Sequence, residues 1–171
     1  MCVPTPLSRA ILNNPAMEYT LRPATPHDLT AVLAWIHSPL DLRLWGGPLL
    51  TYPPDEVKTW REICADEHNT FALVDSAGTL AGFGQTFPRP PEAVHLGRII
   101  LSPAVRGQGL GRVLVRGLID SALERFQPAL ITLNVYRDNL PAVQLYRSLG
   151  FTVTEESVEH GSYAMSLVCT H

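Results

Sequence analysis

The stretch Arg106-Gly107-Gln108-Gly109-Leu110-Gly111 is the most informative part of the sequence. It follows a strand-like run, Val94 to Leu101, and opens a segment whose apolar residues recur at helical spacing to about Phe126. Glycines allow backbone N–H groups to turn toward a ligand, and the start of a helix carries partial positive charge. The stretch therefore predicts a phosphate-binding loop between a strand and a helix, with Arg106 and Arg112 adding positive charge.

Two common glycine-rich phosphate sites do not match this loop. A P-loop needs Lys followed by Ser or Thr after its last glycine, whereas Arg112 and Val113 follow Gly111 here. A dinucleotide-binding fingerprint needs its third glycine at the position that Arg112 occupies. The loop therefore belongs to another class of phosphate site.

A second motif lies on the C-terminal side of the loop. Residues 134–151 read Asn-Val-Tyr-Arg-Asp-Asn-Leu-Pro-Ala-Val-Gln-Leu-Tyr-Arg-Ser-Leu-Gly-Phe. Together with Arg-x-x-Gly-x-Gly at 106–111, this motif resembles the two signatures of the GNAT superfamily of N-acetyltransferases, in their usual order. The resemblance is strong from Val94 to Phe151, whereas only the order of elements matches over Tyr19 to Phe87.

The resemblance implies one α/β (α+β) domain over residues 17–171, with a mixed, centrally splayed sheet of about six to seven strands and about four flanking helices. Residues 1–16 have no counterpart in the family and are expected to form a flexible tail, with Met17 as the true first residue. Strands are expected at Tyr19–Arg22, Phe71–Val74, Thr79–Phe87, Val94–Leu101, Ala129–Tyr136, Phe151–Thr154 and Ser162–Val168, with a hairpin turn at Asp75–Gly78. Helices are expected at Leu29–Ile36, at Asp55–Glu67 with Val57, Trp60, Ile63 and Cys64 on one face, at Gly111–Phe126 and at Asn139–Leu149, with a loop at Ser38–Pro54.

Composition limits the classes to which the chain can belong. Hydrophobic residues make up 46% of the 171 residues and charged residues 17%, which is enough to bury one core and excludes wholesale disorder. The 13 basic and 16 acidic side chains give a net charge of −3, so no nucleic-acid partner is expected. Apolar runs stay short of the roughly 18 residues of a membrane span, and the N-terminal stretch does not resemble a secretory signal. We expect a cytoplasmic protein without membrane contact.

Cysteine and histidine patterns do not indicate a metal site or a disulfide framework. The three cysteines, Cys2, Cys64 and Cys169, are an odd number at wide spacing, and we expect Cys64 and Cys169 to be core residues. The six histidines show no metal-ligand spacing with each other or with cysteine. No metal is therefore expected.

The family resemblance implies acetyl-CoA (coenzyme A) as the cofactor. It implies that the diphosphate binds the glycine loop and that pantetheine pairs with the strand before it, where Gly97 would form a bulge that opens the sheet. It further implies that the last helix lies beside the cofactor. The implied cofactor-binding residues are Ile99, Ile100, Leu101, Arg106, Gly107, Gln108, Gly109, Leu110, Gly111, Arg112, Asn139, Ala142 and Tyr146.

The implied reaction is direct attack of an amine on the thioester in a ternary complex. The family assigns the proton donor for the leaving thiolate to the position of Tyr146. Some members carry a glutamate where this chain has Asn134, which cannot accept a proton but can hold a water. Another branch has its base at the position of His95, and imidazole changes charge near neutral pH, so His95 is the candidate base ahead of Glu92 and Glu155.

The acceptor is the least determined part of the reaction. An apolar, glycine-containing segment with Leu44, Trp45, Leu49, Leu50 and Tyr52 lies where the family builds its acceptor pocket, so Trp45 and Asn134 are the candidate acceptor contacts. We expect a small-molecule amine, with a protein or peptide amine, a non-catalytic acyl-CoA sensor and a plain interaction domain as alternatives. The last strand, Ser162–Val168, either completes the sheet or swaps between two copies in a homodimer.

Overall fold

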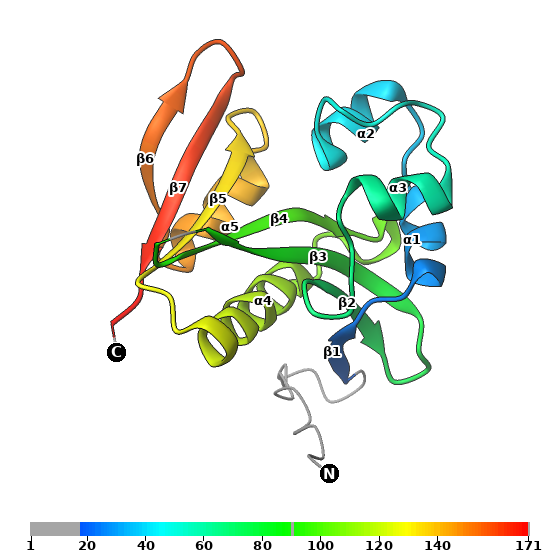
Figure 1. Cartoon of the computed structure of the whole chain (residues 1–171), viewed down its shortest axis with the longest axis horizontal. Helices are drawn as coiled ribbons and strands as arrows, with labels where there is room; N and C mark the ends of the chain where they lie inside the picture. Colours follow the sequence, from blue (N-terminus) through cyan, green and yellow to red (C-terminus); the bar gives the residue numbers. More distant parts are fainter. Residues whose placement is uncertain (1–17, 90, 171) are drawn as a thin grey trace. The chain divides into compact units, whose positions relative to one another are not determined.

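Seven strands form one mixed sheet in the computed structural model, which describes residues 18–89 and 91–170. Their order across the sheet is β1-β2-β3-β4-β5-β7-β6 (Figure 1). The strands are β1 (Tyr19–Pro23), β2 (Thr70–Asp75), β3 (Leu80–Arg89), β4 (Ala93–Leu101), β5 (Leu130–Tyr136), β6 (Thr152–Ser157) and β7 (Ser162–Val168). The helices are α1 (Pro26–Leu33), α2 (Pro39–Gly46), α3 (Glu56–Glu62), α4 (Leu110–Phe126) and α5 (Leu140–Ser148), with a short 3-10 helix at Pro103–Val105. The mixed α/β fold is the predicted one; the tail at 1–16 and the proposed start at Met17 lie outside the described residues.

The chain forms two compact units, and β3, β4 and α4 contribute to both. The described part of the first unit comprises residues 18–85 and 98–117. The described part of the second comprises residues 86–89, 91–97 and 118–170. Each unit holds different candidate residues, so we describe them in turn.

Strands β1, β2 and the start of β3 pair antiparallel and form the framework of the first unit. The predicted turn between β2 and β3 is confirmed. The carboxylate of Asp75 accepts hydrogen bonds from the backbone N–H groups of Ala77 at 2.9 Å and Thr79 at 2.8 Å. Gly78 has a φ of 84°, the left-handed conformation that such tight turns require.

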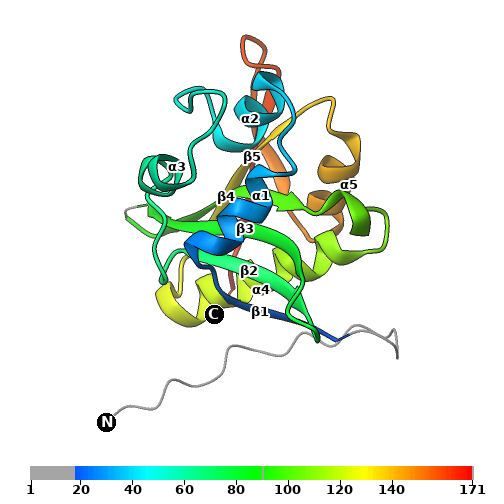
Figure 2. The same ribbon diagram turned by 90° about the vertical axis from the view of Figure 1, so that its right-hand side faces the viewer.

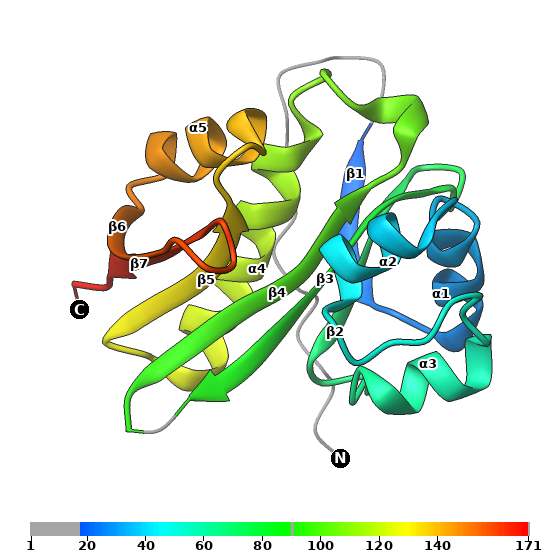
Figure 3. The same ribbon diagram turned by 90° about the horizontal axis from the view of Figure 1, so that it is seen from above.

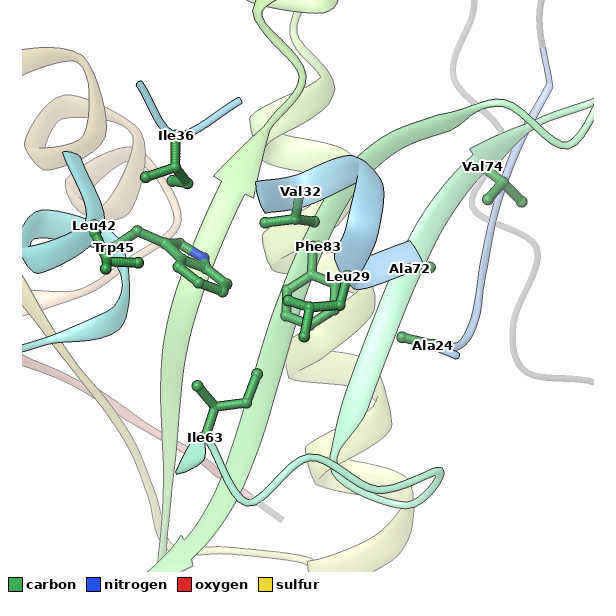
Figure 4. Packing of buried hydrophobic residues seen from close by; sticks show 10 residues of the cluster. All are labelled: Ala24, Leu29, Val32, Ile36, Leu42, Trp45, Ile63, Ala72, Val74 and Phe83. Carbon is green, nitrogen blue, oxygen red and sulfur yellow. The ribbon is translucent and has the colours of Figure 1, made fainter. Parts of the chain in front are cut away.

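Helices α1, α2 and α3 cover one face of these three strands (Figures 1 and 3). Figure 2 shows α1 lying across β2 and β3. The helices bury an apolar cluster against the strands, in which Leu29, Val32 and Phe83 have no exposed surface (Figure 4). Helix α1 starts at a capping box between Thr25 and Asp28, which satisfies N–H groups that would otherwise be left without partners.

The first half of α4 packs on the other face of the three strands, where two glycines allow close approach. A Cβ atom at Gly82 of β3 would lie 3.0 Å from side-chain atoms of Leu101 and Leu114. A Cβ atom at Gly117 of α4 would lie 2.9 Å from Cδ2 of Leu21 in β1. The helix that follows the glycine loop is therefore held close to the strands.

Two predictions for the helices of this unit are wrong. The segment Ser38–Pro54 is not only loop, because Ser38 caps α2 by accepting a hydrogen bond from the backbone N–H of Asp41, and the helix ends at Gly47 with a φ of 90°. Helix α3 ends earlier than predicted, since Cys64 adopts a φ of 51°. Val57 is 61% exposed and Cys64 is also exposed, so neither lies on a buried face as expected.

The second unit is built around β5. This strand runs parallel to β4 from the pair Ala93↔Leu130 to the pair Leu96↔Leu133, and both strands continue beyond these pairs. On its other side β5 is antiparallel to β7, which in turn pairs with β6 (Figure 1). The last strand therefore completes the sheet of its own chain. Helix α5 contacts β5, and Val143 and Tyr146 are its buried residues.

Among the described residues, no helix combines the length and the apolar character that crossing a lipid bilayer would need.

Candidate functional site

The glycine loop lies in the first unit, between β4 and α4, as predicted. Gly107 and Gly109 have φ values of 77° and 81°, and a Cβ atom at either position would meet no atom within 4 Å. These left-handed residues re-aim successive backbone N–H groups in front of a helix start, which is the arrangement of anion-binding loops. Leu110 is only 2% exposed, so its side chain packs into the core and anchors the start of α4.

Two side chains of the loop are bonded back to the chain that precedes them. The exposed guanidinium of Arg106 donates from Nε and Nη2 to the carbonyl oxygen of Leu101, both at 3.3 Å. The amide of Gln108 donates to the carbonyl oxygen of Ala104 at 3.2 Å. The loop is thus fastened to the end of β4, and the positive charge of Arg106 stays at its entrance.

The end of β4 carries an irregular residue just before Ile99–Leu101. It is Arg98, with a φ of 50°, directly after Gly97, where the sequence predicts a bulge. The indole N–H of Trp45 on α2 donates to the carbonyl oxygen of Arg98 at 2.9 Å. The guanidinium of Arg98 donates to the side-chain oxygen of Gln85 on β3 at 3.0 Å, and its burial lowers the pKa of Arg98 below the usual value.

Gln85 is fully buried and links Arg98 to the rest of the first unit. Its amide donates to Oγ1 of Thr70 at 2.9 Å and to the carbonyl oxygen of Ile63 at 3.3 Å. A buried amide with these partners fixes one arrangement of the neighbouring elements. Sequence reasoning missed both Gln85 and Arg98, since their contacts depend on strand pairing.

Trp45, the predicted acceptor contact, is largely buried in the first unit. It is only 8% exposed and packs edge-on against Phe83, with ring centroids 6.0 Å apart. Leu50 also packs against the core cluster. Other apolar residues of the same segment are accessible: Leu44 (47% exposed), Leu49 (89%) and Tyr52 (40%).

His95 and Asn134 lie on one face of the β4–β5 pair in the second unit. Val94 and Leu96 are buried, so the half-buried His95 points to the opposite face. It is paired in register with Thr132, and its Nδ1 lies 2.9 Å from Oγ1 of that residue. Asn134 is exposed two residues along β5, on the same face as Thr132. Thr132 was missed because the register is not visible in a single strand.

Asn139 and Tyr146 lie at the start and near the end of α5. Asn139 is the N-cap and not a helical residue, so the predicted common face of these two residues does not exist in that form. Its side-chain oxygen accepts a hydrogen bond from the backbone N–H of Ala142 at 3.4 Å. Tyr146 is 7% exposed and packs edge-on against Phe151. Burial raises the pKa of the Tyr146 phenol to about 12, so the phenol keeps its proton at neutral pH.

The remaining candidates are less enclosed. The alternative bases, Glu92 and Glu155, are both exposed. Cys64 is exposed and Cys169 half-buried, so the prediction that both are core cysteines is wrong. Residues 18–89 and 91–170 contain no group of three or more potential metal ligands.

Comparison with known proteins gives a consistent result. The model of the Acetyltransferase (GNAT) family matches residues 33–151. The chain is 38% identical over 141 residues to the N-alpha-acetyltransferase RimI of Mycobacterium tuberculosis, covering 79% of this chain and 82% of that protein. It is 33% identical over 137 residues to the streptothricin acetyltransferase of Streptomyces lavendulae, covering 71% of each. The structure of spermidine N-acetyltransferase from Vibrio cholerae in complex with CoA and spermine superposes with a TM-score of 0.72, at 21% identity, over 88% of this chain and 95% of that one.

Proposed function

Because the chain belongs to the GNAT family of acetyltransferases, we propose that it transfers the acetyl group of acetyl-CoA to the amine of a small molecule, by direct attack in a ternary complex. Membership makes it an acetyl-CoA-dependent N-acetyltransferase. One observation carries the proposal beyond membership. The two left-handed glycines stand in open space directly before α4, where the family signature requires a phosphate loop. A single domain over residues 17–171, a cytoplasmic location and a homodimer stay predictions of the sequence.

The first unit would hold the cofactor by its backbone. When bound, acetyl-CoA supplies the thioester that the amine attacks. The N–H groups of residues 107–112 would bind the diphosphate, with Arg106 and Arg112 contributing positive charge. Backbone groups of Ile99, Ile100 and Leu101 would pair with the pantetheine. In the second unit, Asn139 and Ala142 at the start of α5, together with Tyr146, would contact the thioester end.

His95 is our candidate for the general base. An ordinary primary amine has a pKa of about 10.4, so presenting it neutral at pH 7 costs roughly 4.6 kcal/mol. If Nδ1 of His95 donates its proton to Oγ1 of Thr132, Nε2 carries the lone pair of the neutral ring and is the basic nitrogen that would accept the proton of the amine. Asn134, exposed on the same face, would bind the acceptor or a water that relays the proton.

Tyr146 is our candidate for stabilising the leaving thiolate. An ordinary thiol has a pKa of about 8.5. Since the phenol has a pKa of about 12, complete transfer of its proton to the thiolate would be uphill by several kcal/mol. Tyr146 therefore acts by donating a hydrogen bond to the sulfur. The proton that the amine gives to His95 leaves a positive charge in the site, and this charge compensates the negative charge of the thiolate.

A peptide N-terminus is the second candidate acceptor. It is favoured by the similarity to RimI, which is named an N-alpha-acetyltransferase and is matched over 82% of its length. A small molecule is favoured by the similarity to the streptothricin acetyltransferase. Exposed Leu44, Leu49 and Tyr52 suit an acceptor of either kind that has an apolar part beside its amine.

The deciding experiment measures release of free thiol from acetyl-CoA with a panel of amines. The panel contains polyamines, amino acids, aminoglycoside-type and lysine-bearing small molecules, and short peptides with free N-termini. Release with small amines alone supports the first proposal, whereas release with peptides alone replaces it by the second. Binding of acetyl-CoA without release with any amine identifies a non-catalytic sensor. His95→Gln in the same assay tests the base, because full activity across the pH range would remove His95 from the mechanism.

A further inference from the structure

Within the first unit, one residue of α2 makes a hydrogen bond to β4, the strand that precedes the glycine loop. Trp45 on α2 donates its indole N–H to the carbonyl oxygen of Arg98 at 2.9 Å. Arg98 is the residue before Ile99–Leu101, the segment assigned to pantetheine. The contact joins parts of the chain 53 residues apart in sequence.

The conformation of Arg98 requires outside support. A residue other than glycine at a φ of 50° is strained relative to extended backbone, and such residues persist only where their surroundings hold them. Two hydrogen bonds provide this support. Trp45 binds the carbonyl oxygen, and the buried Gln85 accepts a hydrogen bond from the side chain at 3.0 Å.

The same two supports trace back to the helices that cover the sheet. Trp45 belongs to α2, and its ring is packed on Phe83 of β3. Gln85 donates to the carbonyl oxygen of Ile63, the residue that caps the end of α3. A change in the position of α2 therefore acts on the backbone at Arg98 through one short hydrogen bond.

We propose that Trp45 is a positioning residue for the cofactor: its indole N–H holds the left-handed backbone at Arg98 so that the backbone groups of Ile99–Leu101 are presented to pantetheine, and α2 is thereby coupled to cofactor affinity. The inference rests on the proposed function, since it requires that this segment of β4 binds acetyl-CoA. It gives Trp45 a different role from a direct acceptor contact. By linkage, an acceptor that shifts α2 changes the affinity for CoA, and CoA changes the affinity for that acceptor by the same factor.

The test is calorimetry of CoA binding to Trp45→Phe, which keeps an aromatic ring and removes the N–H donor. We expect binding about five- to tenfold weaker, as loss of one hydrogen bond to a carbonyl predicts. KM for acetyl-CoA should rise by a similar factor while kcat at saturating acetyl-CoA changes little. Trp60→Phe is the matched control, because Trp60 of α3 packs against the same core and should leave CoA affinity unchanged.

Two outcomes separate this inference from the function on which it rests. If wild type and both variants fail to bind CoA, the cofactor assignment is wrong. If wild type binds CoA and the folded Trp45→Phe variant binds it equally well, the positioning role is wrong. Should Trp45→Phe not fold, benzothienylalanine at position 45 replaces the N–H by sulfur in a ring of the same shape, and the same two affinities are compared.

Discussion

Tyr146 is proposed to stabilise the leaving thiolate, and its burial keeps the phenol protonated for that role. Tyr146→Phe keeps the ring that packs on Phe151 and removes only the hydroxyl. We expect kcat to fall about a hundredfold, in the range for loss of a positioned proton or hydrogen-bond donor. Calorimetric CoA affinity and the melting temperature should stay near wild type. An unchanged kcat with the best amine of the panel would show that the thiolate is stabilised by another group.

Asp28 illustrates how one side chain holds the start of a helix and a strand together. It accepts two hydrogen bonds from Arg22 of β1, both at 2.8 Å, and one from the backbone N–H of Thr25 at 2.8 Å. Burial alone would raise the pKa of Asp28, but the hydrogen bonds from Arg22 and Thr25 outweigh it and lower the pKa below its usual value. The ionised form therefore stabilises the fold at neutral pH.

Asp28→Asn is accordingly expected to lower the free energy of unfolding by about 2 kcal/mol at pH 7. Because the pKa is depressed in the folded state, this contribution is present above the unfolded value and is lost as pH falls through the folded value. Urea unfolding of wild type and variant should give curves that converge as the pH is lowered from neutral through the range in which Asp28 becomes protonated. A stability difference independent of pH would mean that the charge of Asp28 is not what matters.

At this scale, sequence reasoning succeeded where the signal is local. The left-handed glycines and the hairpin turn at Asp75 were predictable because spacing and residue type determine them. Val57 and Cys64 were misjudged because burial depends on where α3 ends and on what it packs against. Thr132 could not be found, since its contact with His95 exists only in the observed strand register.

The glycine loop is the element on which cofactor binding depends most. Gly109→Ala places a Cβ atom in a left-handed residue, which costs roughly 1–2 kcal/mol in that conformation or forces the backbone out of it. Either way the N–H groups before α4 are re-aimed. We expect CoA affinity, measured by calorimetry, to drop at least about tenfold. This corresponds to a loss of about 1.4 kcal/mol of binding free energy from the re-aimed N–H groups.

Gly78→Ala is the control for backbone strain. Gly78 has a φ of 84°, close to that of Gly109, and likewise has open space around it, but it belongs to the β2–β3 turn. Both variants should lose similar stability, and only Gly109→Ala should lose CoA affinity. Equal CoA affinity in the two variants would remove the loop from the phosphate site.

Element boundaries show which signals local pattern can carry. Most strands were placed nearly as observed because they are short apolar runs bounded by turn residues. Helix α2 was missed because its eight residues contain Pro39 and Gly46, which read as loop, although Ser38 and Pro39 are also a typical helix start. For a segment this short, the cap decides between the two interpretations, and composition does not.

For the whole molecule, the order of motifs carried more information than any single segment. A phosphate loop and a second signature in the correct order predicted a mixed sheet, and the structure shows one, in which β4 and β5 are parallel. The place of β7 between β5 and β6 was not predictable, because completing the sheet and swapping satisfy the same strand pattern. The acceptor is undetermined for a similar reason, since exposed apolar side chains set the character of a pocket and not the identity of its ligand.

Binding of acetyl-CoA should stabilise the folded chain as a whole, because the loop and the end of β4 exist as a site only in the folded state. At a concentration one hundred times the dissociation constant, ligand binding adds about 2.7 kcal/mol to the free energy of unfolding. For a chain of this length that corresponds to a rise in melting temperature of roughly 5–10 °C. Acetyl-pantetheine, which lacks the diphosphate, should give a much smaller rise at the same concentration if the glycine loop supplies most of the affinity. Equal rises with both ligands would place the affinity in the pantetheine-binding strand instead, and no rise with either would contradict the cofactor site altogether.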